Sequence, residues 1–413
     1  MNLTEKLKAF VGSSKGKIEK DEKGKKYYWL LEKIKGEVVK TQYGEHIEKT
    51  VIYGKQYEHS GLKLSKILEI PFDELDAIFN NKHKGMDILR TAFLDTETTG
   101  LAGGSGTYAF LIGVGFFEKN CFKILQFFMP DYSEEASILV RLNNVLSEFE
   151  FLITFNGKVY DIPLLNTRYI INKLDSPLKE IHNLDLLTAC RKIFKKRLKS
   201  VALSNLEKQL LYMERENDIP GFLIPSVYFN YLRTGEIDGL LPIFYHNQKD
   251  ILSMVNLLYA VFDVVKNPLY SHICRDEDYI CIGKLYEDRG DFEKSIECYK
   301  KALETESVKK EAYVRLSLLY KKLNMWDKAV DLWMEMVNKN IDPVFALEEL
   351  AKYFEHKEKN YEEAVKAAEK ALSILMIKKR LLHIDDNKIF DFKKRLERLK
   401  GKKSKAIGQI YLL

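Results

Sequence analysis

The sequence predicts an α/β domain with a mixed β-sheet and flanking helices, followed by a second domain made only of helices. Two observations support this fold class. First, three successive apolar segments lie between residues 90 and 130, and helical and extended segments alternate after them. Second, similar residues recur 34 positions apart after residue 276, which is typical of tandem helical repeats. A chain of 413 residues is long enough for two or three domains.

The first part of the chain is polar. Residues 1–26 are rich in lysine and predict a mobile arm. Residues 27–89 contain short β-like segments such as GEVVKTQYG and form a β-rich N-terminal extension, to which the sequence assigns no function.

Residues 90–265 form the predicted α/β domain. Strands are expected in ILRTAFLDTE, TYAFLIGVGFFE and CFKILQFFMP, because β-branched and aromatic residues dominate them. A helix with Ser133 as its N-cap follows, then a strand near residues 151–155, a helix in YDIPLLNTRYIINKL and a strand in IHNLDLL. The segment RKIFKKRLK, residues 191–199, predicts a further helix that buries an apolar stripe and exposes cations.

Residues 276–374 predict about three helical repeats, and residues 375–413 a basic capping helix with a tail. The pairs that lie 34 apart include Tyr286 with Tyr320 and Tyr299 with Trp333. In the third copy the alanines of the second helix fall one residue late, which indicates a single insertion in the turn between its helices. A helical hairpin cannot bury its apolar face alone, so three linked copies support one another.

Two acidic residues end the first predicted strand of the α/β domain. Asp95 and Glu97 are two residues apart, so both side chains lie on one face of the strand. Burying two carboxylates together is costly unless a cation lies between them. Mg²⁺ and Mn²⁺ prefer such oxygen ligands. A surface pair of acids in a turn is the simpler alternative.

Two further acids can join this pair. Asp161 follows the fourth strand, where a βα loop brings it beside the first. Asp250 lies on a helix, with His246 four residues earlier. Asp185, at the end of the fifth strand, is a further acid with either a functional or a structural role, and His182 is a weaker candidate.

As a set, these acids resemble the signature of the DEDD 3′–5′ exonuclease superfamily, which has a ribonuclease H-like fold. The segments DTETTGLAGGSGTYAFLIG, FNGKVYDIPLL, DIPGFLIPSVYFNYLRTG and YHNQKD are most similar to the bacterial YprB-like group, whose members often carry tetratricopeptide repeats. The resemblance implies two Mg²⁺ or Mn²⁺ ions held by Asp95, Glu97, Asp161 and Asp250. It also implies hydrolysis of phosphodiester bonds in DNA or RNA.

The chain departs from the superfamily pattern at the residue that serves the attacking water. The tyrosine branch has Tyr four residues before the last Asp, and the histidine branch has His five before it; here His246 is four before Asp250 and Tyr245 five before. A residue four positions away shares the face of a helix, so His246 is the favoured general base. A capping or core histidine without a catalytic part is the alternative.

The glycine-rich segment after Glu97 predicts contacts with a phosphate or terminal sugar, because glycine lets a ligand approach the backbone. A plain hairpin turn is the alternative. The cations of residues 191–199 predict phosphate contacts, with a solvated helix face as the alternative. The candidate substrate-binding residues are Thr98, Thr99, Gly100, Leu101, Ser105, Asn156, Arg191 and Lys195.

Composition sets the remaining expectations. The net charge of +6 permits a polyanionic partner without requiring one. Five cysteines with no C-x-x-C pair predict reduced thiols, and neither a signal peptide nor a membrane span is apparent, so a cytoplasmic protein is expected. The resemblance implies an exonuclease of single-stranded ends, and the repeats predict a protein or peptide partner. The alternative is a nucleic-acid-binding or scaffolding protein with little or no turnover.

Overall fold

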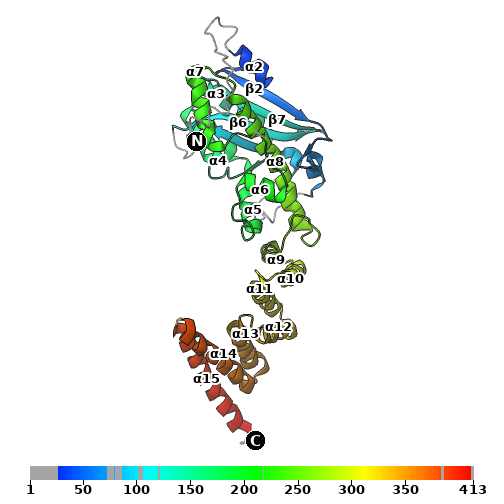
Figure 1. Cartoon of the computed structure of the whole chain (residues 1–413), viewed down its shortest axis with the longest axis vertical. Coiled ribbons are helices and arrows are strands. Elements are labelled where there is room, and N and C mark those ends of the chain that lie inside the picture. Colours follow the sequence, from blue (N-terminus) through cyan, green and yellow to red (C-terminus); the bar gives the residue numbers. More distant parts are fainter. Residues whose placement is uncertain are drawn as a thin grey trace. The chain divides into compact units, whose positions relative to one another are not determined.

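The structure is a computed structural model of the chain. It describes residues 27–71, 79, 86–100, 106–119, 121–216, 218–382 and 386–410, so the predicted arm of residues 1–26 lies outside the described residues. The chain divides into two compact units, Met1–Cys274 and Arg275–Leu413, and each is considered by itself (Figure 1).

The first unit is built on a seven-stranded sheet with the order β1-β2-β7-β6-β5-β8-β9. β5 pairs with β8, and β8 with β9, in parallel, whereas the other neighbouring strands are antiparallel, which confirms the predicted mixed sheet. The strands of this sheet are β1 Glu37–Thr41, β2 Gly44–Tyr53, β5 Thr91–Thr98, β6 Ala109–Glu118, β7 Cys121–Phe128, β8 Phe151–Thr154 and β9 His182–Asp185. Two short strands, β3 Glu58–His59 and β4 Leu62–Lys63, pair separately.

The N-terminal β-rich segment belongs to this same sheet. After helix α2, Tyr28–Ile34, β1 and β2 form a hairpin, and β2 pairs with β7 from Ile47 opposite Phe128 to Tyr53 opposite Phe122. The sheet therefore continues across the boundary at residues 89 and 90 that the sequence suggested.

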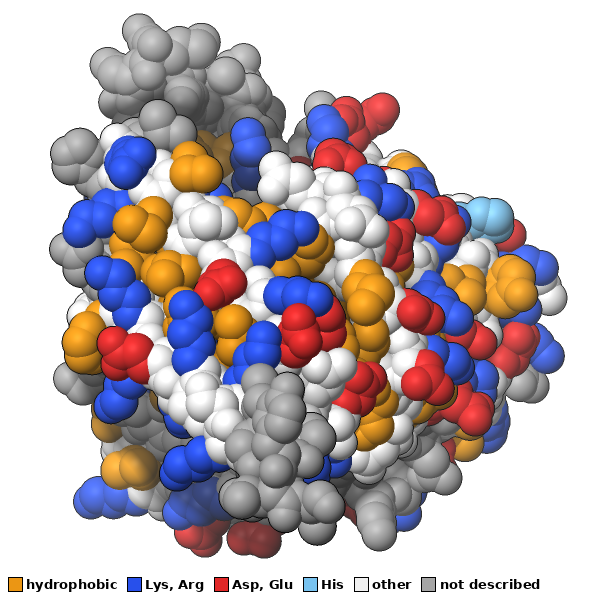
Figure 2. Space-filling view, turned by 90° about the horizontal axis from the view of Figure 1, so that it is seen from below, with side chains coloured by type: hydrophobic (Ala, Val, Ile, Leu, Met, Phe, Trp, Pro, Cys, Tyr) orange, Lys and Arg blue, Asp and Glu red, His pale blue; other side chains and the backbone are white. Residues whose placement is uncertain are grey.

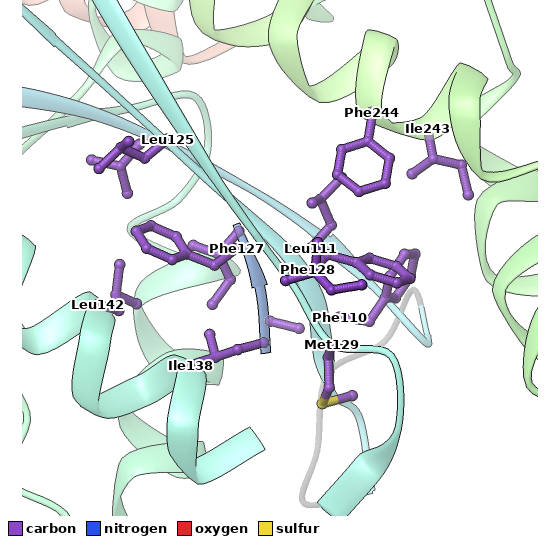
Figure 3. Close-up of a cluster of buried hydrophobic side chains, with 14 of the residues drawn as sticks. Phe110, Leu111, Leu125, Phe127, Phe128, Met129, Ile138, Leu142, Ile243 and Phe244 are labelled. Carbon is purple, nitrogen blue, oxygen red and sulfur yellow. The ribbon is translucent and has the colours of Figure 1, made fainter. Parts of the chain in front are cut away.

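Helices cover both faces of the sheet, and side chains alternate between them. Figure 3 shows Leu142 of α3 on one side of the strands and Phe244 of α8 on the other. Phe128 faces α8, with its ring 5.3 Å from that of Phe244, whereas its neighbour Phe127 faces α3. The helices of this unit after α2 are α3 Glu135–Leu146, α4 Asp161–Ile171, α5 Leu186–Phe194, α6 Leu203–Leu210, α7 Ile224–Thr234 and α8 Leu240–Lys266.

Two local predictions were wrong. Ser133 does not cap α3: the Asp131 side chain accepts from the Ser133 N–H and caps a 3₁₀ turn, η4 Tyr132–Glu134, that leads into the helix. The basic helix predicted over residues 191–199 ends at Phe194. Cations four residues apart, such as Arg191 and Lys195, repel each other and disfavour a longer helix. The apolar stripe itself is confirmed, because Ile193, Phe194 and Leu198 are buried.

The second unit is all-helical, as predicted. Its helices are α9 Asp278–Arg289, α10 Phe292–Ala302, α11 Lys309–Lys322, α12 Trp326–Asn338, α13 Pro343–Tyr353, α14 Tyr361–Leu382 and α15 Asp386–Ile410. Successive helices pack on one another. The residues that recur 34 positions apart form the core: Tyr299 and Trp333 are completely buried, and Tyr286 and Tyr320 nearly so.

The predicted insertion in the third repeat has a structural counterpart. A turn of π-helix, η7 Phe354–Glu358, follows α13 and leads into the short segment before α14. A π-turn is wider than an α-turn and so takes in one extra residue without breaking the helix. It buries Glu355, whose carboxylate binds Arg398 at 2.7 Å and Lys402 at 2.8 Å, both on α15.

Basic and acidic side chains are mixed on the face of the molecule that Figure 2 shows. Figure 2 shows Lys and Arg interspersed with Asp and Glu on the face in view. The predicted basic helix α15 follows this pattern, since its Lys400 pairs with Glu369 at 2.9 Å. Within the part of the chain that the structure describes, no helix combines the length and apolarity needed to span a membrane. All five cysteines are free thiols.

Candidate active site

Asp95 and Glu97 lie at the carboxyl end of β5, on the sheet face that α8 covers. Asp95 is opposite Gly113 of β6, and Glu97 is opposite Leu111. The register shifts between Glu97 and Thr98, so a β-bulge ends the strand directly after the acids. Glu97 is buried and Asp95 half-buried.

Two glycines allow α8 to lie directly on the backbone of β6. A Cβ atom at Gly113 would lie 2.2 Å from Oδ1 of Asn247, and one at Gly115 would lie 2.4 Å from Cγ2 of Ile251. Neither position can therefore carry a side chain with α8 in this place. The close packing brings the part of α8 that carries Asp250 next to β5.

Side-chain amides fix the orientation of Asp95. Nδ2 of Asn247 donates to Oδ2 of Asp95 at 2.8 Å, and Oδ1 of Asn247 accepts from Nε2 of Gln126 at 2.8 Å. Gln126 also donates to the Phe244 carbonyl at 2.9 Å and accepts from Gln248 at 2.9 Å. Because each amide has several partners, the network holds one arrangement.

Asp161 approaches the end of β5 from another direction. It is the first residue of α4, and its Oδ1 accepts a hydrogen bond from Oγ1 of Thr96. Thr96 lies between Asp95 and Glu97 in the strand, so its side chain alternates to the opposite face. Asp161 thus reaches the site beside the sheet rather than from the α8 face.

Asp185 holds the loop that carries Asp161. Its carboxylate accepts backbone N–H groups of Asn156 at 2.9 Å, Lys158 at 3.2 Å and Leu187 at 3.0 Å. Asn156 has a left-handed backbone, with φ of 66°. These contacts favour the structural alternative for Asp185. His182 packs its ring 5.5 Å from that of Phe151.

His246 and Asp250 share one face of α8, with Nε2 of His246 at 3.7 Å from Oδ2 of Asp250. Asp218 binds Nδ1 of His246, with both carboxylate oxygens at 2.9 Å. Arg215 pairs with Asp218 at 3.0 Å and with Asp250, and its Nε donates to Glu207 at 2.8 Å. The five side chains form one connected, largely buried group.

The site carries more negative than positive charge. Burial, followed by the charges of Asp250, Glu97 and Asp161, raises the pKa of Asp95 well above its usual range. Burial also raises the pKa of Glu97 to about 8 and that of Asp161 to about 6, although the charge of His246 and the Thr96 hydroxyl, respectively, oppose these shifts.

The same carboxylates act on His246. Burial disfavours its charged form, but Asp250, Asp218 and Glu97 outweigh burial and raise its pKa to about 10. His246 is therefore a cation at neutral pH in the protein without a bound metal.

The donor chemistry fits a divalent cation, but the side chains are not gathered around one point. Oxygen donors surround the site, and Oδ1 of Asp250 is buried with the ion pair to Arg215 as its contact. Yet no three His, Cys, Asp or Glu side chains of the described residues are close enough together to hold a metal ion. Asp95 is bound by Asn247, Asp161 by Thr96 and Asp250 by Arg215.

Two threonines form hydrogen bonds within the segment after Glu97. Oγ1 of Thr98 donates to the Gly100 carbonyl at 2.8 Å, and Oγ1 of Thr99 accepts from the Tyr108 N–H at 2.9 Å. These bonds tie the start of the segment to its end, and the hydroxyls are thereby engaged. Leu101 and Ser105, also predicted to contact substrate, lie outside the described residues.

The two predicted phosphate-binding cations are at the surface. Arg191 lies near the end of α5, Lys195 follows it, and both are exposed. No hydrogen bond or ion pair of the described residues joins either cation to the acids. Tyr245, the alternative to His246, is partly exposed on α8 under Nζ of Lys249, 5.1 Å from its ring centre.

Sequence reasoning missed Glu207, Arg215 and Asp218 as parts of the site. They come from α6 and the segment between α6 and α7, where hydrophobic periodicity gives no warning of a buried cation. Asp218 opens DIPGFLIP, a segment that carried the family resemblance, and this was the available signal. For Gln126, the signal was a single amide within the apolar strand CFKILQFF.

Comparison with known proteins agrees with this architecture. Residues 92–262 match the RNase_H superfamily, and residues 279–307 match a tetratricopeptide repeat. The chain is 32% identical to "Uncharacterized protein YprB" of Bacillus subtilis (strain 168) over 296 residues, which cover 70% of this chain and 71% of that protein. A shorter match, 36% identity over 93 residues, covers 21% of this chain and 18% of BBSome complex member BBS4 of Bos taurus. The chain therefore belongs to the RNase_H superfamily, in the family of YprB, and carries tetratricopeptide repeats after its superfamily domain.

Proposed function

We propose that the chain is a metal-dependent nuclease, and specifically a 3′–5′ exonuclease that hydrolyses phosphodiester bonds at single-stranded ends of DNA or RNA. Membership of the RNase_H superfamily supports nuclease-type activity. The observation that carries the proposal is the set of Asp95, Glu97 and Asp161, whose pKa values are raised because the fold buries them with too little positive charge. A bound divalent cation is the natural complement of such a site.

Asp95, Glu97, Asp161 and Asp250 are the residues that would hold two Mg²⁺ or Mn²⁺ ions. Such ions, when bound, activate a water molecule and stabilise the leaving oxygen of a phosphodiester. The protein contributes preorganisation: Asn247 and Gln126 hold Asp95 in one orientation before anything binds. Asp185 does the same for the loop that leads to Asp161.

His246 is the proposed residue for orienting or deprotonating the attacking water. Asp218 fixes its Nδ1 side, which leaves Nε2 directed toward Asp250. Its raised pKa keeps it protonated in the metal-free protein, so it becomes a base only when added positive charge in the site lowers that pKa.

The remaining assignments concern partners. We propose that the segment with Thr98, Thr99, Gly100, Leu101 and Ser105 contacts the terminal nucleotide together with Asn156. Exposed Arg191 and Lys195 would bind backbone phosphates, which every nucleic acid carries. The tetratricopeptide repeats support a protein or peptide partner.

The test is degradation of single-stranded DNA and RNA labelled at the 5′ end, with Mg²⁺, Mn²⁺ or a chelator. We expect stepwise shortening that requires metal and stops at a blocked 3′ end. Asp95→Asn and Asp161→Asn should each lower the rate about a thousandfold with the fold retained, because each removes a charge that the metal site needs. Glu118→Gln, at the exposed end of β6, is the matched control and should leave the rate unchanged.

Unchanged rates in both Asp variants would contradict the catalytic assignment. A second candidate function is then favoured: a nucleic-acid-binding or scaffolding protein with little turnover. The pairing of Arg215 with Asp250, in place of a gathered metal site, motivates it. Binding to single strands in chelator, without degradation in either metal, would support this second function.

A further inference from the structure

Arg215 is a buried cation held among three carboxylates. Its side chain is 10% exposed, and that of its partner Glu207 is 1% exposed. Nε donates to Oε2 of Glu207 at 2.8 Å, and Nη1 donates to Oδ2 of Asp218 at 3.0 Å. Nη2 binds the other oxygen of Glu207 and also meets Oδ1 of Asp250.

These contacts are not equivalent. Glu207 receives two N–H groups of the guanidinium in a bidentate pair, the strongest arrangement that arginine forms. Asp250 is held through one oxygen only, because its Oδ1 pairs with Nη2, which Arg215 also uses for Glu207. Arg215 can therefore lose Asp250 and keep Glu207 and Asp218.

Charge ties Arg215 to both carboxylates. Burial lowers the pKa of Arg215, but the charge of Asp250, followed by the hydrogen bonds and charge of Glu207, outweighs burial and raises it. Glu207 lies in the interior, where burial raises its pKa and the contacts from Arg215 oppose that shift, whereas Asp250 lies among other acids of the site. A divalent cation at Asp250 would thus bind a carboxylate whose present partner, Arg215, is also held by Glu207 and Asp218.

We propose that Arg215 is a tethered competitor of the divalent cation at Asp250. The inference rests on the proposed function. In the metal-free protein Arg215 neutralises Asp250, and a metal ion binds by taking over that carboxylate while Arg215 remains attached to Glu207 and Asp218. The arginine thereby weakens metal binding and sets the concentration at which the site fills.

The test measures Mn²⁺ binding to the full-length protein by isothermal titration calorimetry, without nucleic acid. Arg215→Met alone would leave Glu207 buried and unpaired, so it is combined with Glu207→Gln. We expect this double variant to bind Mn²⁺ at least about tenfold more tightly than the natural protein, because a buried positive charge has been removed beside the ion. Arg215→Lys keeps the charge but loses the bidentate fork, and should give a smaller gain.

The matched control is the pair Arg141 and Glu48, joined at 2.8 Å on α3 and β2. Arg141→Met with Glu48→Gln makes the same chemical change there and should leave Mn²⁺ affinity unchanged. Circular dichroism and thermal melting establish that each variant is folded. If the Arg215 double variant does not fold, the comparison of Arg215→Lys with the natural protein decides.

Three outcomes separate the inference from the function beneath it. Tighter binding in the Arg215 variants alone supports the competitor, including the case in which only those variants bind Mn²⁺. Equal or weaker binding in folded Arg215 variants, with metal-dependent degradation intact, overturns the competitor and leaves the nuclease standing. Failure of every protein to bind Mn²⁺ overturns both.

Discussion

The buried carboxylates of the candidate site and those of the repeat unit are handled in opposite ways. In the repeat unit, Glu349 binds Lys321 at 2.5 Å and Lys352 at 2.7 Å, and Glu355 binds two cations of α15. Burial disfavours the charge of both, but these partners prevail and lower the pKa of each. In the sheet unit, the pKa values of Asp95 and Glu97 are raised instead.

The difference separates carboxylates whose charge is compensated in the fold from carboxylates whose uncompensated charge destabilises it. A buried acid with its own lysine or arginine contributes to packing and to the choice of partner helix. A buried acid without one costs free energy, and active sites are where such costs recur. Asp95 and Glu97 are of this second kind, and the missing positive charge is what the proposed metal ions would supply.

The sharpest test of this comparison is the response of each unit to pH in the absence of metal. Glu97 has a pKa of about 8 in the folded chain against 4.5 ordinarily, and His246 about 10 against 6.5. Both hold their proton more tightly when folded. The stability that these two protons contribute is therefore fully present below about pH 4.5 for Glu97 and 6.5 for His246, and should be lost as the pH rises through about 8 and 10, respectively.

The repeat unit should respond in the reverse sense. Glu349 and Glu355 have lowered pKa values, so their stabilising effect is present above about pH 4.5 and is lost as the pH falls below it. Hydrogen exchange in chelator, resolved by peptide and corrected for intrinsic rates, measures both units in one sample. Parallel pH profiles in the two units would refute the distinction.

Metal should stabilise one unit only. At a free Mn²⁺ concentration of a hundred times its dissociation constant, we expect the sheet unit to gain about 2.7 kcal/mol and the repeat unit nothing. Hydrogen exchange at pH 8 with Mn²⁺ or chelator measures the gain, which Asp95→Asn should remove. Equal protection of both units would point to nonspecific binding.

Replacing a buried glutamate by glutamine should change the free energy of unfolding in opposite directions in the two units. At pH 8 without metal, Glu97→Gln should raise the stability of the sheet unit by about 2 kcal/mol, because it removes a charge that burial disfavours. Glu355→Gln should lower that of the repeat unit by about 1 kcal/mol, because its partners Arg398 and Lys402 are partly exposed and screened. Denaturant unfolding of the two variants measures both changes, and destabilisation by Glu97→Gln would show that its charge is compensated after all.

Much of the fold follows from periodicity. The strands of residues 91–128, the alternating helices and strands to residue 185, and the repeats all carry strong local patterns. Even the one-residue lag in the third repeat corresponds to a physical feature, the π-turn at residues 354–358. The prediction of the cap before α3 failed because two suitable residues compete there. Asp131 and Ser133 are both good N-caps, and in the structure Asp131 is the N-cap of the 3₁₀ turn that leads into the helix.

The site was less predictable, because its geometry depends on contacts between distant segments. Strand alternation places Asp95 and Glu97 on one face, and helix spacing places His246 beside Asp250. No pattern within the sequence indicates that Arg215 pairs with Asp250 across 35 positions. The hydrogen bond between Thr96 and Asp161 was likewise not predictable, because it depends on how α4 packs beside the strand.

Gly113 and Gly115 have a consequence for how the protein tolerates change. With no side chain on β6 at these two positions, the distance between the strand and the helix is set by the β6 main chain against Asn247 and Ile251, and substitutions elsewhere in the core do not change these contacts directly. Neighbouring core residues can therefore be replaced while the distance between β6 and α8 is kept. A related chain with a bulkier residue at either position has to hold its helix farther away, and should therefore accommodate a differently proportioned ligand.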